Sequence, residues 1–285
     1  MPTAEKPEIQ IDTAADSGLT AETEDQTTES PLRANLEKLS NWCTSVIFKT
    51  DKSKYTLFSN LDLWFNYHYT NMAYQADYYR WGKLISSNLN IAGIPGSPRA
   101  YSHRGQFIVS LNKRDSAFPK GTGIDYFVLE MLATRTRDQE AILLENTSIT
   151  AKSYDQALVA FQKTPTFSPV YYILTGRSDS GKNPEGVVIE KTCTGVHANY
   201  YLDWENPNHE ENKWFLVQTN YDRDLPDPKS DYRRVPMEQK IGKAGFAGMT
   251  ADVGWQFLHE TPNFVPFGPQ SYTFASFIVQ LDYTK

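Results

Sequence analysis

The chain changes character at residues 43–62, CTSVIFKTDKSKYTLFSNLD, where aromatic and β-branched residues first gather. This stretch contains two short β-prone runs, Cys43–Phe48 and Tyr55–Phe58, with the polar segment Lys49–Lys54 between them. Two such runs joined by a short polar connection are typical of a β-hairpin. We therefore expect the folded body of the protein to begin with a hairpin at Cys43.

The elements predicted beyond this hairpin come in blocks of strands and of helices. They are strands at Gln106–Leu111, Val170–Thr175, Gly186–Glu190, Trp214–Gln218 and Ser271–Leu281, and helices at Ile124–Ala133, Asp138–Glu145, Ser153–Lys163 and Ala251–His259. The helix at Ser153 opens with Ser153-x-x-Gln156, the spacing of a capping box. Blocks of one kind favour an α+β fold with antiparallel sheets over a doubly wound parallel sheet.

Residues 1–42 differ in composition from the rest of the chain. They hold nine acidic and three basic residues, so they carry the whole net charge of −6, and no aromatic residue precedes Trp42. Such a segment buries too little apolar surface to offset the entropy lost on ordering. We predict that residues 1–42 are a flexible leader or propeptide and that residues 43–285 form the folded domain. No basic segment followed by an apolar stretch begins the chain, so the sequence as given predicts no secretory signal.

Composition excludes several classes of protein. Residues 43–285 have as many acids as bases, which gives no bulk attraction for phosphate backbones and argues against nucleic acid as a partner. The sequence contains no run of about 18 apolar residues, so no membrane-spanning helix is expected. The five histidines and two cysteines lack the spacing of a metal site, and neither a Gly-x-Ser-x-Gly elbow nor a phosphate-binding glycine loop occurs. We therefore expect no metal and no cofactor.

Cys43 stands at the junction between the acidic leader and the first predicted strand. If the Trp42–Cys43 bond were cut, Cys43 would become a new N-terminus. Its α-amino group, with a reference pKa of about 7.7–8.0, would then be able to act as general base for its own thiol. Taken alone, however, Cys43 is more simply interpreted as a small buried hydrophobe.

Four motifs in order along the chain bear on this choice. They are Cys43-Thr-Ser-Val-Ile, Asn60-Leu-Asp62, Gln218-Thr-Asn220-Tyr-Asp222-Arg223 and Asp231-Tyr-Arg233-Arg234, with supporting matches at Leu111-Asn112, Leu144-Glu145-Asn146 and Tyr171-Tyr172-Ile173-Leu174-Thr175-Gly176. In this order they resemble the β-subunit of the family of acid ceramidase and N-acylethanolamine-hydrolysing acid amidase. The resemblance runs from Cys43 to about Lys285.

The resemblance implies an N-terminal-nucleophile hydrolase of the choloylglycine-hydrolase type. The implied fold is α+β, a four-layer αββα sandwich. Members of the family are precursors that cut themselves just before the cysteine, and the implied activity is hydrolysis of a fatty-acyl amide lipid, either ceramide or an N-acylethanolamine. Cys43 would then be the nucleophile, first towards the peptide bond before it and later towards the lipid amide.

The resemblance also assigns catalytic roles to three further residues. Asp62 would accept a hydrogen bond from the liberated amine, Asn220 would donate to the oxyanion, and Arg233 would orient or stabilise the same centre. Taken singly, an Asp after a strand is more often a turn or cap residue, and the other two lie in strings typical of solvated loops. Only their joint order relative to Cys43 favours the catalytic interpretation.

Residues 63–69 form an aromatic run just beyond the aspartate motif, and we expect Trp64 and Phe65 to bind substrate there. The run would line the mouth of an acyl-chain channel or touch a lipid surface, and the second case would give the protein a peripheral contact with a membrane. Core packing or a subunit contact is the plain alternative. Asn112 is the third residue to which we assign substrate binding.

The family further implies a lysosomal location and, as a partner, a separate α-subunit or a lipid-presenting protein. The sequon Asn146-Thr147-Ser148 matches a glycosylation acceptor if the chain is secreted. Two residues depart from the family pattern: Ser59 replaces an arginine that lies against the nucleophile, and Lys113 replaces a glutamate. We infer that Ser59 removes a buried positive charge, so the alternative is a catalytically impaired paralogue that binds lipid or a protein partner.

Overall fold

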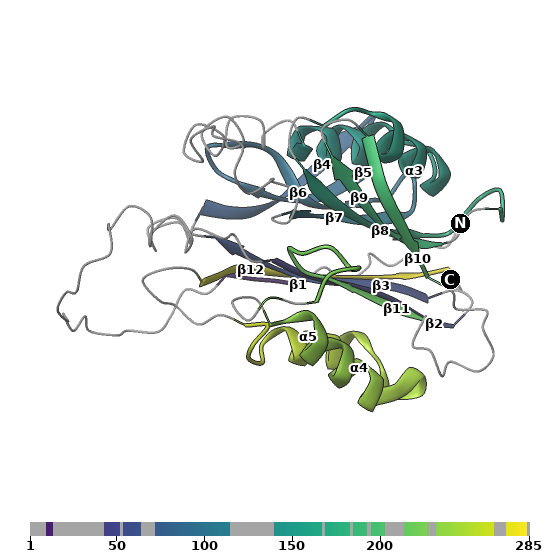
Figure 1. The fold of residues 1–285 in the computed structure, drawn as a ribbon. Helices are drawn as coiled ribbons and strands as arrows, with labels where there is room; N and C mark the ends of the chain where they lie inside the picture. The colour runs from purple at the N-terminus through teal and green to yellow at the C-terminus, as the bar shows by residue number, and fades with distance from the viewer. Residues whose placement is uncertain are drawn as a thin grey trace, which may run out of the picture.

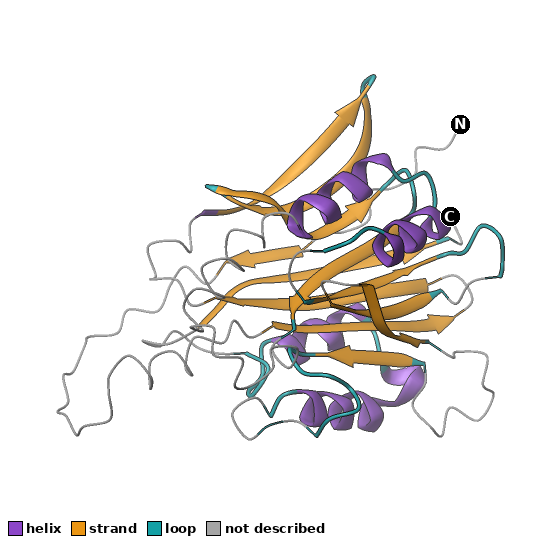
Figure 2. Cartoon of the chain, turned by 45° about the horizontal axis from the view of Figure 1, so that its top comes forward, coloured by secondary structure: helices purple, strands orange, loops and turns teal. Residues whose placement is uncertain are grey.

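The computed structural model describes residues 10–13, 43–51, 54–63, 72–114, 140–166, 169–182, 185–192, 195–202, 214–226, 228, 232–264 and 272–283. The predicted helix Ile124–Ala133 and the predicted substrate-binding residues Trp64 and Phe65 lie outside these residues, as do 1–42 apart from 10–13. The described elements form two stacked sheets with helices outside them (Figures 1 and 2).

One sheet has five strands in the order β1-β12-β3-β2-β11. The strands are β1 (Gln10–Thr13), β2 (Cys43–Asp51), β3 (Lys54–Leu63), β11 (Phe215–Gln218) and β12 (Tyr272–Asp282). All neighbouring strands are antiparallel. β2 and β3 pair with Cys43 opposite Leu61, which confirms the predicted hairpin.

The other sheet has seven antiparallel strands in the order β10-β9-β8-β7-β6-β5-β4, so that each strand pairs with the next along the chain. The strands are β4 (Ala73–Arg80), β5 (Lys83–Ile91), β6 (Ile94–Ser102), β7 (Phe107–Lys113), β8 (Val170–Gly176), β9 (Gly186–Thr192) and β10 (Gly195–Tyr201). In this meander β7 and β8 are neighbours, and both lie across from β2 and β3 of the five-stranded sheet.

The described helices lie on the two outer faces of the pair of sheets (Figure 1). A helix that includes residues 140–150 and α3 (Tyr154–Lys163) cover the seven-stranded sheet. Helices α4 (Arg234–Gly248) and α5 (Ala251–Leu258) cover the five-stranded sheet. The Ser153 side chain accepts from the Gln156 N–H, as the predicted capping box requires.

The central core lies between the two sheets and is built from side chains of both. Cys43, Ile47 and Leu57 from the five-stranded sheet share this core with Ile108 and Tyr171 from the other. Because side chains alternate along a strand, every second residue of β2, counted from Cys43, faces this interior. The start of β2 is therefore enclosed by both sheets.

The predicted α+β class with antiparallel sheets is confirmed. The strand predictions at Gln106–Leu111 and Trp214–Gln218 and the helix prediction at Ala251–His259 match β7, β11 and α5 within a residue or two. Strands β4, β5, β6 and β10 and helix α4 were not predicted. Within the segment that we predicted to be a leader, Gln10–Thr13 pair with β12 as an edge strand. The edge of a sheet offers unpaired N–H and C=O groups to any extended segment within reach, whatever its side chains.

Candidate active site

Cys43 is a free thiol, 3% exposed, at the first residue of β2. Burial is the largest effect on the thiol and raises its pKa above the ordinary value. Arg99 and Arg233 oppose this effect by their charge, whereas the charge of Asp62 adds to it. The backbone of Asp62 also stabilises the thiolate by a hydrogen bond.

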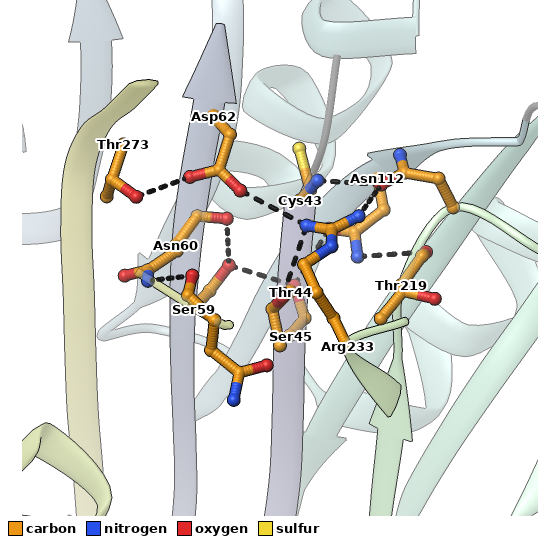
Figure 3. A network of polar contacts seen from close by, with 12 residues as sticks. Cys43, Thr44, Ser45, Ser59, Asn60, Asp62, Asn112, Thr219, Arg233 and Thr273 are labelled. Atoms are coloured by element: carbon orange, nitrogen blue, oxygen red, sulfur yellow. Dashed lines mark hydrogen bonds and ion pairs between the residues drawn. The ribbon is translucent and has the colours of Figure 1, made fainter. Parts of the chain in front are cut away.

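Asp62 and Arg233 form a buried ion pair next to Cys43 (Figure 3). Arg233 Nη1 lies 3.1 Å from Asp62 Oδ2, and Thr273 Oγ1 donates to the other carboxylate oxygen over 2.7 Å. Asp62 sits at the end of β3, and Arg233 lies at the start of α4, beneath the same sheet. The aspartate is thus held by two donors from different elements, which fixes its orientation.

Asn220 connects this ion pair to Cys43. Its Oδ1 accepts from the backbone N–H of Cys43 over 2.7 Å and from Arg233 Nη2 over 2.8 Å. Its Nδ2 donates to the carbonyl of Lys113 over 2.9 Å. The structure therefore brings the four predicted catalytic residues together, although they come from four separate segments. It is Asn220, and not Asp62, that accepts from the Cys43 nitrogen while the chain is uncut.

Asn112, to which we assigned substrate binding, is fully buried on β7. Its Nδ2 donates to the carbonyls of Gln218 and Thr219 over 2.9 and 3.3 Å, and its Oδ1 accepts from Ser45 Oγ over 2.8 Å. These contacts tie β7 to the segment that carries Asn220. The contact between Asn112 and substrate stays a prediction.

A fifth polar residue, Arg99, was missed by the sequence analysis. Arg99 lies on β6 in the facing sheet, is fully buried, and donates from Nε to Ser59 Oγ over 2.8 Å. Our inference that Ser59 removes a buried positive charge from the site is therefore wrong, because the Arg99 guanidinium lies against that serine. Only the tertiary structure brings the two together, since Ile94–Ser102 has no local pattern that marks an arginine for the interior.

Lys113, the second departure from the family pattern, is half-buried at the end of β7. Its neighbour Asn112 points between the sheets, so alternation along the strand directs the Lys113 side chain to the opposite face. At the site, the carbonyl of Lys113 accepts from Asn220 Nδ2.

In the described part of the chain, no group of three or more His, Cys, Asp or Glu side chains is placed to hold a metal ion. Among the described helices, none has the length and apolar character that a membrane crossing requires. The sequon residue Asn146 is exposed within helical residues 140–150, and Ser148 of the same sequon is buried.

No family model matches the chain. Individual proteins do match it: N-acylethanolamine-hydrolysing acid amidase of Rattus norvegicus is 27% identical, over 78% of this chain and 57% of the relative. The Caenorhabditis elegans amidase is 30% identical over 71% of this chain and 52% of the relative. Acid ceramidase of Mus musculus is 29% identical over 71% of this chain and 51% of the relative. The chain thus spans little more than half the length of these curated relatives.

A solved structure agrees with the sequence comparison. The structure of a Caenorhabditis elegans orthologue of N-acylethanolamine-hydrolysing acid amidase superposes with a TM-score of 0.64 at 27% identity, covering 77% of this chain and 87% of the other. The fold and the comparisons define the class: the chain is a homologue of N-terminal-nucleophile amidases. Within that class it is homologous to N-acylethanolamine-hydrolysing acid amidase and to acid ceramidase, which confirms the resemblance found in the sequence.

Proposed function

We propose that the chain is the precursor of an amidase that hydrolyses the amide bond of a fatty-acyl amide lipid, either ceramide or an N-acylethanolamine. The observation that carries the proposal is the hydrogen bond from the Cys43 backbone nitrogen to Asn220 Oδ1, made beside the buried pair of Asp62 and Arg233. A cysteine whose nitrogen and thiol both lie within one polar, buried network has what an N-terminal nucleophile needs once the bond before it is cut.

The first step of the proposal is self-cleavage. The Cys43 sulfur attacks the carbonyl carbon of the residue before it, the bond from that carbon to the Cys43 nitrogen breaks, and a thioester forms. Water then hydrolyses the thioester, which returns the thiol and leaves a free α-amine on Cys43. Asn220 holds the nitrogen that departs in this step, because its Oδ1 already accepts from the Cys43 N–H over 2.7 Å.

Turnover follows the same chemistry with the lipid amide in place of the peptide bond. The α-amine takes the thiol proton, the thiolate attacks the amide carbonyl, and the proton passes to the leaving amine while an acyl thioester remains. Water then releases the fatty acid. Asp62 orients the α-amine, Asn220 donates from Nδ2 to the oxyanion, and Arg233 holds both side chains in place.

Mass spectrometry of the purified chain during incubation at acidic pH tests the proposal. We expect a fragment that begins at Cys43 to accumulate, together with hydrolysis of a fluorogenic fatty-acyl amide. Cys43→Ala should remain intact and inactive, whereas Cys193→Ala serves as the matched control and should be cut as wild type is. A wild-type chain that stays intact and hydrolyses nothing would overturn the proposal.

The alternative is a catalytically impaired paralogue that binds lipid or a protein partner, and it is motivated by Ser59 and Lys113. The position of Arg99 against Ser59 argues against this alternative, because a guanidinium is available at the site. An inert wild-type protein that gains hydrolysis on Ser59→Arg would favour the alternative.

Location and partners form part of the same proposal. We propose a lysosomal location and an acidic working pH, since the relatives are named as acid enzymes. A separate α-subunit or a lipid-presenting protein is the proposed partner, and the run at Trp64 and Phe65 is proposed to contact substrate or a lipid surface. Activity towards substrate in vesicles, compared with Trp64→Ala, measures that contact.

A further inference from the structure

Arg99 is a buried cation next to the candidate site that the proposed reaction does not yet use. Its side chain is fully buried, although arginine is almost never buried without a partner. The guanidinium donates to Ser59 Oγ over 2.8 Å, to the Asn60 carbonyl over 3.3 Å and to Asn112 Oδ1 over 3.4 Å. It also donates to the carbonyls of Pro98 and Leu111 on its own side of the interface.

Every one of these acceptors is neutral. Within the described residues, no carboxylate forms an ion pair with Arg99, whereas two other buried arginines have one: Arg233 pairs with Asp62 and Arg114 pairs with Asp222. Arginine cannot shed its proton inside a protein, so its charge remains when water is removed. A buried charge of this kind gains most from an anion placed next to it.

Two groups near Arg99 carry or can take a negative charge: the carboxylate of Asp62, which already pairs with Arg233, and the thiol of Cys43. Ser59 and Asn60, which receive the guanidinium, lie on β3 opposite Ser45 and Thr44 of β2, and the next pair along the two strands is Leu61 with Cys43. Among the charged side chains, Arg99 contributes most to lowering the pKa of Cys43 against the effect of burial. The thiol in turn is the first group that raises the pKa of Arg99 against its own burial.

We propose that Arg99 is the counter-ion of the Cys43 thiolate, a positioning residue that acts from the facing sheet and is held in place by Ser59, Asn60 and Asn112. The inference rests on the proposed function in that it takes Cys43 as the reactive thiol. The guanidinium touches neither the lipid nor the scissile bond. It lowers the free energy of the thiolate that attacks them, and the thiol proton moves to the amine as before.

The small size of Ser59 is part of this arrangement. A serine at this position offers an acceptor to Arg99 Nε and leaves the room that the guanidinium occupies. An arginine at position 59 would place its own guanidinium in that same room. A guanidinium should therefore stabilise the Cys43 thiolate from position 59 as well as from position 99. Exchanging the two residues tests this expectation.

The test measures how readily Cys43 reacts with iodoacetamide at a series of pH values, with mass spectrometry as the readout. A Cys193→Ser background leaves Cys43 as the single cysteine of the chain. The alkylation rate follows the thiolate fraction, and removing an opposite charge at this range shifts a pKa by about one unit or more. We therefore expect Arg99→Leu to slow alkylation at least about tenfold at each pH below the thiol pKa.

Two further variants separate charge from packing. Arg99→Lys keeps a positive charge and should stay closer to wild type than Arg99→Leu does. The exchange Ser59→Arg with Arg99→Leu should restore the wild-type rate and its pH profile. A purely structural role for Arg99 predicts the opposite sign, because a loosened site would admit the reagent faster at all pH values alike.

Arg114→Leu is the matched control. It removes a second buried guanidinium, the one that pairs with Asp222 over 2.6 Å, but Arg114 is not among the groups that act on the Cys43 thiol. Its circular dichroism spectrum and Cys43 alkylation profile are compared with those of Arg99→Leu, and we expect the profile to be that of wild type. If Arg99→Leu does not fold, the Cys43 alkylation rates of Arg99→Lys and of the exchange variant test the proposal instead.

The inference and the proposed function fail in different ways. An unchanged alkylation profile in Arg99→Leu, or an exchange variant that folds but stays slow, overturns the role of Arg99 even if the chain cuts itself and hydrolyses lipid. A wild-type chain that never cuts itself overturns the function, while a tenfold effect of Arg99→Leu on the same thiol would still establish the counter-ion.

Discussion

At the scale of single residues, the candidate site depends on buried charges that compensate each other. Asp62 is fully buried and Arg233 nearly so, and each has the other as its charged partner over 3.1 Å. Breaking one side of such a pair leaves an unpaired charge in the interior, which costs more than the pair itself contributes. This pair therefore holds the geometry of the site, and the loss of either member should destabilise the fold.

We predict that Arg233→Met lowers the free energy of unfolding by about 3–5 kcal/mol, because Asp62 is left buried without its ion-pair partner. Urea unfolding in a Cys43→Ala background, which prevents self-cleavage, measures the change. Glu238→Gln is the control, since it breaks a partly exposed pair with Arg223 of 3.7 Å and should cost about 1 kcal/mol or less. Adding Asp62→Asn to Arg233→Met should recover part of the loss, and no recovery would contradict the explanation.

At the scale of elements, the hairpin of β4 and β5 carries an unfavourable turn residue. Trp81 and Gly82 connect the strands with φ values of 55° and 73°, and Trp81 is 91% exposed. Two-residue turns with both φ values positive favour Asn or Asp followed by Gly, because a bulky residue is strained there. Because the Trp81 side chain is almost fully exposed, packing against the described residues does little to offset the strain of its backbone.

Trp81→Asn should therefore raise the free energy of unfolding, by about 0.5–1 kcal/mol. Gly82→Ala is the counterpart: a Cβ there meets nothing within 4 Å, so the expected loss of about 1 kcal/mol comes from the backbone alone. Thermal unfolding of both variants checks the two signs. A destabilising Trp81→Asn would mean that the indole packs against part of the chain outside the described residues.

Helix α5 approaches β3 closely at Gly254, which the sequence pattern alone does not require. A Cβ at Gly254 would lie 2.8 Å from Phe58 Cδ1 and 2.9 Å from Phe58 Cε1. We predict that Gly254→Ala lowers the free energy of unfolding by about 1–3 kcal/mol, although alanine is the better helix former. Gly248→Ala in α4 has open space around its Cβ and should cost nothing. Equal effects of the two substitutions in urea unfolding would contradict the close approach.

At the scale of the whole molecule, the stacking of two sheets encloses charges other than those of the candidate catalytic residues. Glu190 of β9 is fully buried and faces Tyr171 across the strand pair, and the hydroxyl of Tyr171 donates to Asp222 over 2.6 Å. Burial, followed by the charge of Asp222, raises the pKa of Glu190 from 4.5 to about 7. The folded protein therefore holds a proton on Glu190 that the unfolded chain gives up.

This raised pKa makes stability depend on pH with a defined sign. Between about 4.5 and about 7 the folded state binds more protons than the unfolded state, so the free energy of unfolding falls as pH rises through this window. The contribution is complete below about pH 4.5. Glu190→Gln should flatten this dependence, which unfolding at several pH values measures. An unchanged slope in Glu190→Gln would assign the dependence to other groups.

The sequence predicted the elements whose pattern is local. The hairpin at Cys43, helix α3 with its cap at Ser153, and strands β7 to β9 follow from periodicity and turn residues that neighbours in the chain supply. Helix α4 was missed because Pro236 lies near its start and Gly245, with a φ of 69°, interrupts it. Strand β4 was missed because most of it is exposed and its three half-buried residues, Ala73, Ala76 and Tyr78, show no regular alternation.

For the candidate site, too, some features were predicted from the sequence and others came only from the tertiary structure. By itself the sequence determined the class of protein and which four residues to bring together, since Cys43, Asp62, Asn220 and Arg233 each sit in a recognisable string. Only the tertiary structure decided that Arg99 joins them and that Asn220 accepts from the Cys43 nitrogen. The physical reason is that strand neighbours leave a local trace in the chain, whereas a contact between two stacked sheets depends on how the layers pack.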